Sequence, residues 1–244
     1  MNRLLILLCI FIFFCASTQA RNIRLAVGPD HSRMIVNNYP LYRASWLFLT
    51  QALRKSGHTV SVVSQPWSKA LSTVQEGKLD GLFLAANLVG RKEWAVLSTP
   101  LGYDYFGFFV NSNYQSSGNK IASVRINNLD QILSSKQQNN LIQVPTAQRG
   151  LQLLAKNGID KFILARGYGE YLIKNELKSI SKYIHFQEQG AEKRSAHIAL
   201  SKQSLSYKIL KEIIDKAIYQ GIKEGDYEKI MKENKLPTDM WIAL

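Results

Sequence analysis

The stretch from Pro66 to Pro100 constrains the fold most, because two helix-like segments flank a short apolar strand with almost no spacer. Apolar residues recur on one face of the first segment, and Gly77 is a natural helix stop. These apolar residues are Trp67, Ala70, Leu71 and Val74. Residues 80–86 predict a buried strand, and the following helix directs free N–H groups beyond the sheet, where they favour an anion. Arg91, about one turn into that helix, can grip a carboxylate, so a ligand site is expected here.

The alternation of strands and helices begins near residue 22. Residues 22–28 and 59–63 predict strands, with a helix between them from about Arg43 to Gly57. Combined with the stretch above, the pattern is β-α-β-α-β-α. This pattern predicts an α/β fold with a parallel sheet and helices on both faces.

A second alternation follows an extended run at 101–110 and a polar junction at 111–119. Its strands are expected at 121–126, 141–144 and 162–165, and its helices at 129–133, 148–155 and 168–175. A polar stretch at 187–194 then leads into a strand at 196–200. Amphipathic helices at 210–218 and 227–232 are expected to return to the first unit.

The two alternations predict two lobes, each a mainly parallel sheet flanked by helices, joined by two crossover strands. Lobe 1 is expected to comprise residues 21–110 and 196–244, and lobe 2 residues 111–195. The crossovers near 108–111 and 197–201 would act as a hinge. A ligand is expected in the crevice at the carboxyl ends of the strands.

Residues 1–20 have the three parts of a secretory signal peptide. Arg3 supplies the charged region, residues 4–14 the apolar region, and Thr18-Gln19-Ala20 a small-x-small cleavage site. The apolar run is about half the roughly 20 residues of a spanning helix, which disfavours a membrane anchor. We therefore expect a soluble periplasmic protein that begins at Arg21.

Composition limits the chemistry of the mature chain. Both cysteines, Cys9 and Cys15, lie in the signal segment, so no disulfide is expected. Of the 31 Lys and Arg only Arg3 is removed, which leaves 30 against 18 Asp and Glu, a formal charge of +12. This charge indicates either a basic solvated exterior or attraction of anions such as an acidic ligand or an anionic membrane surface. Because the protein is expected to be exported, nucleic acid is not an expected binding partner.

Short motifs occur in a fixed order over nearly the whole mature chain. They are Pro66-Trp67, Ala70-Leu71, Gly77-Lys78-Leu79-Asp80-Gly81, Arg91, Ser98-Thr99-Pro100-Leu101, Gly158-Ile159-Asp160 and Gly225-Asp226-Tyr227-Glu228-Lys229-Ile230. In this order they resemble the bacterial extracellular solute-binding proteins of family 3, the type II periplasmic binding proteins of amino-acid uptake. The resemblance implies a non-enzymatic monomer without cofactor or metal. Such a receptor closes around a small carboxylated solute and passes it to an ABC transporter or reports it to a membrane sensor.

The resemblance also implies roles for particular residues. The arginine that matches Arg91 holds the ligand's α-carboxylate. A Thr or Ser usually lies three residues before it; here Leu88 takes that place, and Asn87 beside it is the candidate substitute. The aspartate that holds an α-ammonium falls on Ala165 or Arg166, and Arg166 would repel an amine. We therefore expect an amine-free anion between Arg91 and Arg166, unless Glu170 binds an amine.

The contribution of lobe 2 has two alternatives. Either Asn127-Asn128 opens a helix beside Arg125, or Thr146 caps the next helix and contacts the anion. Five aromatic residues border the expected crevice: Tyr39, Tyr42, Trp67, Tyr103 and Tyr105. Tyr39 and Tyr103 are the two that we expect to stack on the ligand.

An enzyme on the same fold is the alternative function, because some members of the fold resemble dehydratases that act on small carboxylic acids. Catalysis requires a positioned acid or base, and only Asp30-His31 and Glu170 suggest one. Serine-hydrolase and zinc-protease motifs do not occur, and the four histidines are scattered.

Overall fold

The computed structural model describes residues 20–37, 39–88, 90–114, 120–124, 133 and 138–242. The predicted signal peptide, apart from Ala20, lies outside these residues. So do Arg125, Asn127 and Asn128, and the predicted helix at 129–133 apart from Leu133. In the part of the chain that is described, no helix is both long and apolar enough to cross a membrane.

The first lobe is built on three parallel strands, with β1 paired to both β2 and β3. These strands are β1 (Asn22–Val27), β2 (Thr59–Ser64) and β3 (Gly81–Ala86). The helices that follow them are α2 (His31–Val36), α3 (Pro40–Lys55), α4 (Trp67–Gln75) and α5 (Arg91–Trp94), and a short strand, β4 (Ala95–Leu97), comes after α5. The predicted strands and the two long helices are confirmed. The sequence does not predict α2 and β4, because these elements are too short to show a periodic pattern.

The second lobe is also mainly parallel, because β6 pairs in parallel with both β7 and β8. Its described elements are β6 (Ile121–Val124), β7 (Ile142–Val144), α7 (Ala147–Ala155), β8 (Lys161–Ala165), α8 (Arg166–Asn175) and the 3₁₀ turn η1 (Lys178–Ile180). All but η1 coincide with predicted segments. The N-cap of α7 is Thr146, whose hydroxyl accepts a hydrogen bond from the Arg149 N–H at 3.2 Å.

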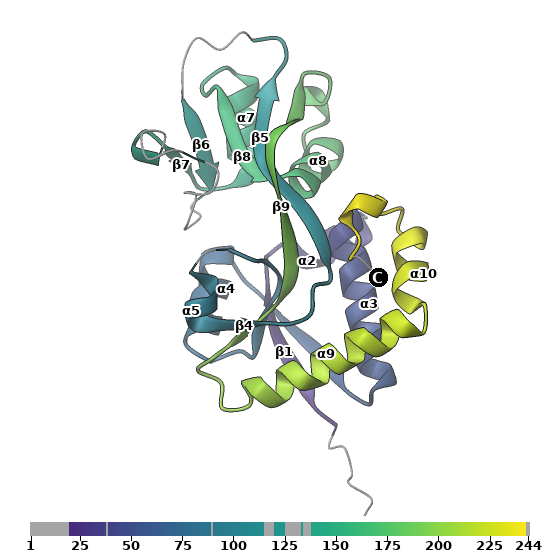
Figure 1. Cartoon of the computed structure of the whole chain (residues 1–244). Coiled ribbons are helices and arrows are strands. Elements are labelled where there is room, and N and C mark those ends of the chain that lie inside the picture. Colours follow the sequence, from purple (N-terminus) through teal and green to yellow (C-terminus); the bar gives the residue numbers. More distant parts are fainter. Residues whose placement is uncertain are drawn as a thin grey trace, which may run out of the picture.

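Two long antiparallel strands, β5 (Gly102–Asn111) and β9 (Ile184–Ser201), run between the lobes (Figure 1). They join all strands into one sheet in the order β2-β1-β3-β9-β5-β8-β6-β7, with β4 beside β9. The sequence predicts only residues 196–200 of β9, and this was wrong, because the strand begins twelve residues earlier at Ile184. The polar stretch 187–194 lacks an apolar pattern, yet it pairs with β5 on either side of an irregularity between Phe106 and Phe108.

The C-terminal helices α9 (Tyr207–Lys223) and α10 (Asp226–Glu233) return to the first lobe, as predicted, and pack on α3 (Figure 1). The final 3₁₀ turn, η2 (Thr238–Met240), lies beside β5. Tyr227, fully buried, donates to the Leu101 carbonyl and accepts from the Ile242 N–H. These bonds fasten the end of the described chain to the first lobe.

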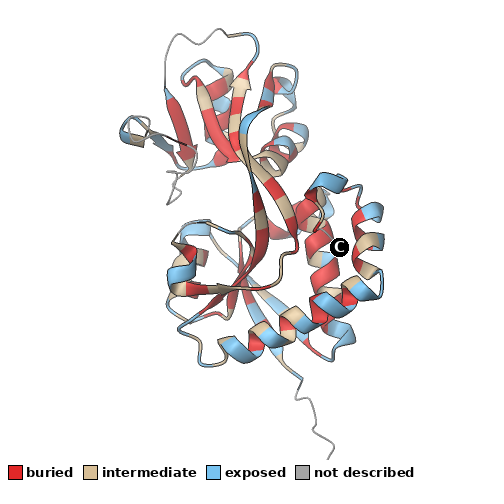
Figure 2. Ribbon diagram, in the orientation of Figure 1, coloured by how far each residue is buried: buried red, intermediate tan, exposed pale blue. Residues whose placement is uncertain are grey.

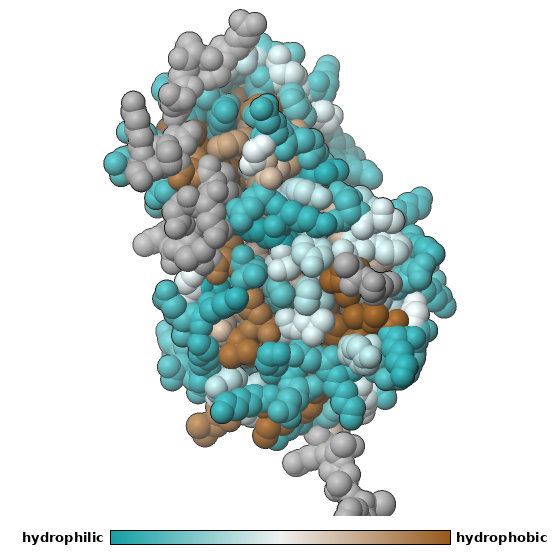
Figure 3. Space-filling view, in the orientation of Figure 1, coloured by the Kyte–Doolittle hydropathy of each residue, from teal (hydrophilic) through white to brown (hydrophobic). Residues whose placement is uncertain are grey.

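Burial follows the sheet. The inner strands β1, β3, β6 and β8 are mostly buried, whereas β2 and β7 at the two ends of the sheet are largely exposed, and the helices present exposed outer faces (Figure 2). One large apolar cluster extends through both lobes, from Ile23 and Phe48 to Phe109 and Phe162. Where the crossover strands pass between the lobes, the face in view is hydrophilic (Figure 3). Polar residues of the crossover therefore lie where a ligand crevice is expected in this fold.

Candidate functional site

A cavity of about 500 Å³ lies at the carboxyl end of β3, beside the crossover strands. The residues that line it are Asn87, Leu88, Gly90, Lys92, Tyr103, Glu192, Lys193, Arg194 and Ser195. They come from the β3–α5 connection, β5 and β9. The Asn87 N–H donates to the Ser195 carbonyl at 2.9 Å and so fastens that connection to β9. Asn87 and Tyr103, two of the predicted site residues, therefore share one cavity.

Arg91 does not itself line this cavity, although Gly90 and Lys92, its neighbours in the chain, both do. Its side chain is only 8% exposed, and the guanidinium carbon lies 5.6 Å from the centre of the Trp94 ring. The Nε and Nη1 atoms have no hydrogen-bond partner among the described residues. Burial lowers the pKa of the guanidinium to about 10. Arg91 is the first residue of a helix of four residues, not one turn into a longer helix as expected.

The cavity wall carries more positive than negative charge. Lys92, Lys193 and Arg194 contribute cations, and Glu192 is the acidic residue of the lining. Arg194 is 4% exposed and pairs with Glu192 at 2.5 Å, which neutralises both. The Lys193 ammonium lies 4.6 Å from the centre of the Tyr103 ring, which holds that cation at the cavity wall. Such a wall favours an anion.

His197 lies on β9, two residues after Ser195 of the cavity lining. Its Nδ1 is 2.6 Å from the Ser98 carbonyl oxygen and its Nε2 is 2.7 Å from the Ser195 hydroxyl. Because a carbonyl only accepts, Nδ1 donates and Nε2 accepts from Ser195. Burial lowers the His197 pKa, which favours this neutral form. The residue therefore supports the wall that carries Ser195.

A different set of contacts surrounds Tyr39, which is buried and is not part of the cavity lining. Its hydroxyl donates to the Asp104 carboxylate at 3.1 Å, and its ring stacks on Tyr168 and Tyr171 of α8. Burial raises the pKa of Tyr39 well above its ordinary range. The structure therefore places Tyr39 in a contact between α3 and α8.

Two further predicted residues also lie outside the lining. Arg166 begins α8 and pairs with Glu170 at 3.1 Å and with Glu188 at 3.3 Å. Its guanidinium carbon lies 5.9 Å from the Tyr105 ring centre. Thr146 caps α7, as described above. The structure therefore does not bring Arg166 and Thr146 together with Asn87 in this cavity.

The residues considered for acid–base catalysis are also dispersed. His31 is buried, with Nδ1 2.8 Å from the Tyr42 hydroxyl, and burial lowers its pKa. Asp30 instead pairs with Arg33. Glu170 is exposed and pairs with Arg166. Asp30 and His31 thus have different partners and do not form an acid–base pair.

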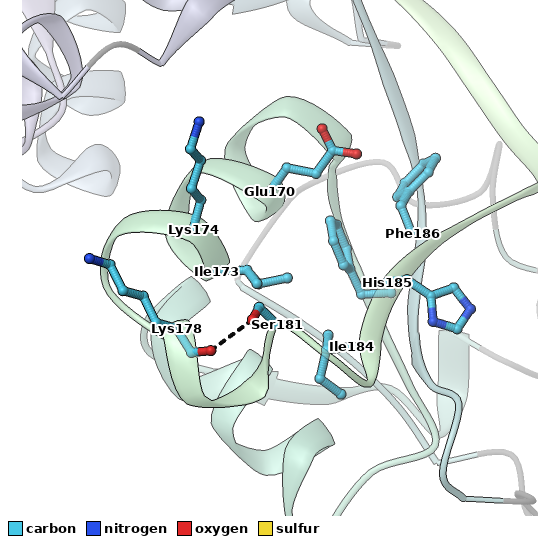
Figure 4. Close-up of a pocket in the computed structure, with 9 residues that line it drawn as sticks. Glu170, Ile173, Lys174, Lys178, Ser181, Ile184, His185 and Phe186 are labelled. Atoms are coloured by element: carbon cyan, nitrogen blue, oxygen red, sulfur yellow. Dashed lines mark hydrogen bonds between the residues drawn. The ribbon is translucent and has the colours of Figure 1, made fainter.

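A second cavity of about 510 Å³ lies within the second lobe (Figure 4). Its residues are Phe109, Glu170, Ile173, Lys174, Lys178, Ser181, Ile184, His185 and Phe186. The Lys174 and Lys178 side chains extend away from the apolar floor (Figure 4). Since its cationic groups do not converge, we take the cavity beside β3 as the candidate site. Among the described residues, no group of three His, Cys, Asp or Glu could hold a metal ion.

The sequence analysis missed Glu192, Lys193, Arg194 and Ser195 as site residues. One signal for them existed, since two cations, Lys193 and Arg194, lie just before the apolar run 196–200, separated from it only by Ser195. They enter the cavity only because the polar stretch pairs with β5. Asp104 was also not predicted. Its surroundings come from three segments that are distant in the sequence, so only the folded chain brings them together.

Comparison with solved structures gives strong similarities in fold. A histidine kinase sensor domain with similarity to periplasmic binding proteins matches with a TM-score of 0.71 at 20% identity, covering 88% of this chain and 96% of that one. A substrate-binding protein of an ABC uptake transporter from Streptococcus pneumoniae, with bound histidine, matches with a TM-score of 0.70 at 16% identity, covering 91% and 95%. The arginine-, lysine-, histidine-binding protein ArtJ from Geobacillus stearothermophilus matches with a TM-score of 0.67 at 14% identity, covering 87% and 94%.

The chain therefore has the two-lobed fold of the periplasmic binding proteins, and the resemblance to the family 3 solute-binding proteins is confirmed at the level of the fold. Neither the protein-family models nor the curated protein sequences give a match. The similar proteins named above are substrate-binding or sensor proteins rather than enzymes.

Proposed function

We propose that this chain is a periplasmic solute-binding protein that holds a small amine-free carboxylate between its lobes. In this proposal the protein, exported by cleavage after Ala20, is a monomer that delivers the solute to an ABC transporter or reports it to a membrane sensor. The fold supports this class of function, because similar structures belong to amino-acid transport proteins and to a sensor domain.

The observation that carries the proposal is the buried guanidinium of Arg91, with two nitrogens that lack a partner in the described chain. A buried cation without a partner is costly, and a carboxylate at two of its N–H groups would relieve that cost. Gly90 and Lys92, which flank Arg91 in the chain, both line the cavity. We propose that a small movement of the β3–α5 connection exposes the guanidinium to a ligand in this cavity.

The wall of the cavity supports an anion without an amine. Glu192 is already paired with Arg194, so an ammonium in the cavity would meet Lys92 and Lys193 without a free carboxylate beside it. We propose Lys193 as the second cation, in place of Arg166, which two glutamates neutralise. Asn87 and Tyr103 would provide an amide and a ring face for the rest of the solute.

The division into lobes, residues 21–110 with 196–244 and residues 111–195, stays a prediction. The pairing supports a hinge in the crossover strands: residues 106–109 of β5 pair with β8, while residues 196–200 of β9 pair with β3 and β4. Bending between these pairings would open and close the crevice.

Thermal unfolding with a panel of solutes tests the proposal. Monocarboxylates and dicarboxylates without an amine should raise the melting temperature more than α-amino acids do. A solute at a hundred times its Kd adds about 2.7 kcal/mol. Arg91→Met keeps the length of the side chain and removes the charge, so it should abolish the shift without lowering the melting temperature of the free protein.

Arg54→Ala, at an exposed arginine on α3, is the matched control and should bind like the wild type. Full binding by Arg91→Met, or a tighter fit for a zwitterionic amino acid, contradicts the proposed site. Mass spectrometry of the solute after incubation separates a receptor from the dehydratase-like alternative, because an enzyme would return the solute with altered mass.

A further inference from the structure

Asp104 is a carboxylate, 5% exposed, that contacts both lobes at the crossover. One oxygen accepts from the hydroxyl of Tyr39, the N-cap of α3 in the first lobe, at 3.1 Å. The other accepts from the N–H of Gly167, in the first turn of α8 in the second lobe, at 3.1 Å, and from the N–H of Tyr105 at 2.8 Å. Moving the lobes apart would break at least one of these bonds.

An aromatic contact surrounds this carboxylate. Tyr39 stacks on Tyr42 of its own lobe and on Tyr168 and Tyr171 of α8, with ring centres 5.6–6.2 Å apart. A Cβ atom at Gly167 would lie 2.9 Å from the Tyr39 ring and 3.1 Å from the nearer Asp104 oxygen. The contact therefore requires glycine at position 167 and leaves no space between the helices for another group.

We infer that Asp104 is a latch that joins the two lobes without a ligand and holds them more firmly in acid than at neutral pH. The inference is independent of the proposed function, since it concerns the free protein. When the lobes separate, the Asp104 carboxylate is exposed to water, which stabilises its charge. When the lobes are joined, the carboxylate is buried, and burial favours its protonated form.

The charges around Asp104 support this direction. Burial, the largest cause, raises the pKa of Asp104 to about 6, although the bonds from Gly167, Tyr105 and Tyr39 lower it; Glu170 raises it further. Arg194, opposite Asp104 on β9, pairs with Glu192, and Arg166 pairs with Glu170.

The sign of the pH effect follows from the two pKa values. A pKa of about 6 with the lobes joined, against 3.8 for the ordinary carboxyl, means that the joined form binds the extra proton between these values. Acidification from pH 7.5 to pH 5 should therefore raise the ratio of joined to separated molecules about tenfold.

The test uses ligand-free protein and two measurements. In NMR titrations the Gly167 and Tyr105 amide signals should shift with a midpoint near pH 6. Small-angle scattering should give a smaller radius of gyration at pH 5 than at pH 7.5. Asp104→Asn, which keeps the shape of the side chain, should remove both pH effects.

Gly167→Ala inserts the methyl group against Tyr39 and should enlarge the radius at both pH values. Gly158→Ala is the matched control, because a Cβ there makes only ordinary contacts of 3.4 Å or more. Amide midpoints near pH 4, a radius that does not change with pH, or equal radii for Gly167→Ala and Gly158→Ala would each overturn the latch. Because no solute is added, these results do not depend on whether Arg91 binds a carboxylate.

Discussion

At the scale of single residues, His197 illustrates how a buried polar group is made neutral and fully bonded. Its two nitrogens face the Ser98 carbonyl and the Ser195 hydroxyl, and burial lowers its pKa. In the unfolded chain the imidazole takes up a proton near pH 6.5, whereas in the folded protein it resists protonation. The stability that this residue contributes is therefore present above pH 6.5 and is lost as the pH falls.

His197→Gln should reduce the loss of stability between pH 7.5 and pH 5.5. At pH 7.5 the variant should be less stable by about 1–3 kcal/mol, because two buried hydrogen bonds are disturbed. Urea unfolding at both pH values measures this. His185→Gln, at an exposed histidine of the same strand, is the control and should behave like the wild type. His31 and Asp104 also contribute to the pH dependence of stability, but they contribute equally in the wild type, in His197→Gln and in His185→Gln. An unchanged pH dependence in His197→Gln would contradict this account.

At the scale of elements, α7 shows how a glycine in a helix makes room for a large side chain of the neighbouring strand. Its buried residues recur at helical spacing and face the sheet: Ala147, Gly150, Leu151 and Leu154. A Cβ at Gly150 would lie 2.2 Å from the Phe162 ring of β8. Glycine therefore sets the distance between α7 and β8, although it is a poor helix former.

Two opposing effects decide the outcome of Gly150→Ala. Alanine favours the helix by about 1 kcal/mol, but a methyl group forced into a packed core costs about 1–3 kcal/mol, and more where the neighbour is a rigid ring. We expect the clash to prevail, so denaturant unfolding should show a less stable protein. Gly158→Ala again provides the control, with little change expected. A stabilised Gly150→Ala variant would show that α7 can shift away from β8.

At the scale of the whole molecule, the two lobes share one sheet through β5 and β9. β5 pairs along its length with residues 184–196 of β9, and the register shifts between Phe106 and Phe108, opposite residues 187–192 of β9. Because the strands pair on both sides of this irregularity, the lobes are expected to move as two rigid bodies about this short segment rather than to unfold from each other. The shared sheet thus permits closure without loss of the core.

A solute that stabilises the protein in the thermal test should also reduce its radius of gyration at pH 7.5, because closure buries the crevice. Small-angle scattering with and without that solute measures the change. Arg91→Met should give the same scattering curve under both conditions. Identical curves for the wild type, at saturating solute, would rule out a closing clamp.

The sequence by itself determined most helices and strands and the two-lobed α/β class, because periodicity and helix stops are local properties. It also pointed to Asn87 and Tyr103, which line one cavity, and to Arg91 beside them. Tertiary structure decided the first two thirds of β9, residues 184–195, since a polar stretch becomes a strand only when β5 satisfies its backbone. For the same reason, only the folded chain placed Lys193 in the cavity wall and buried Asp104 between the lobes.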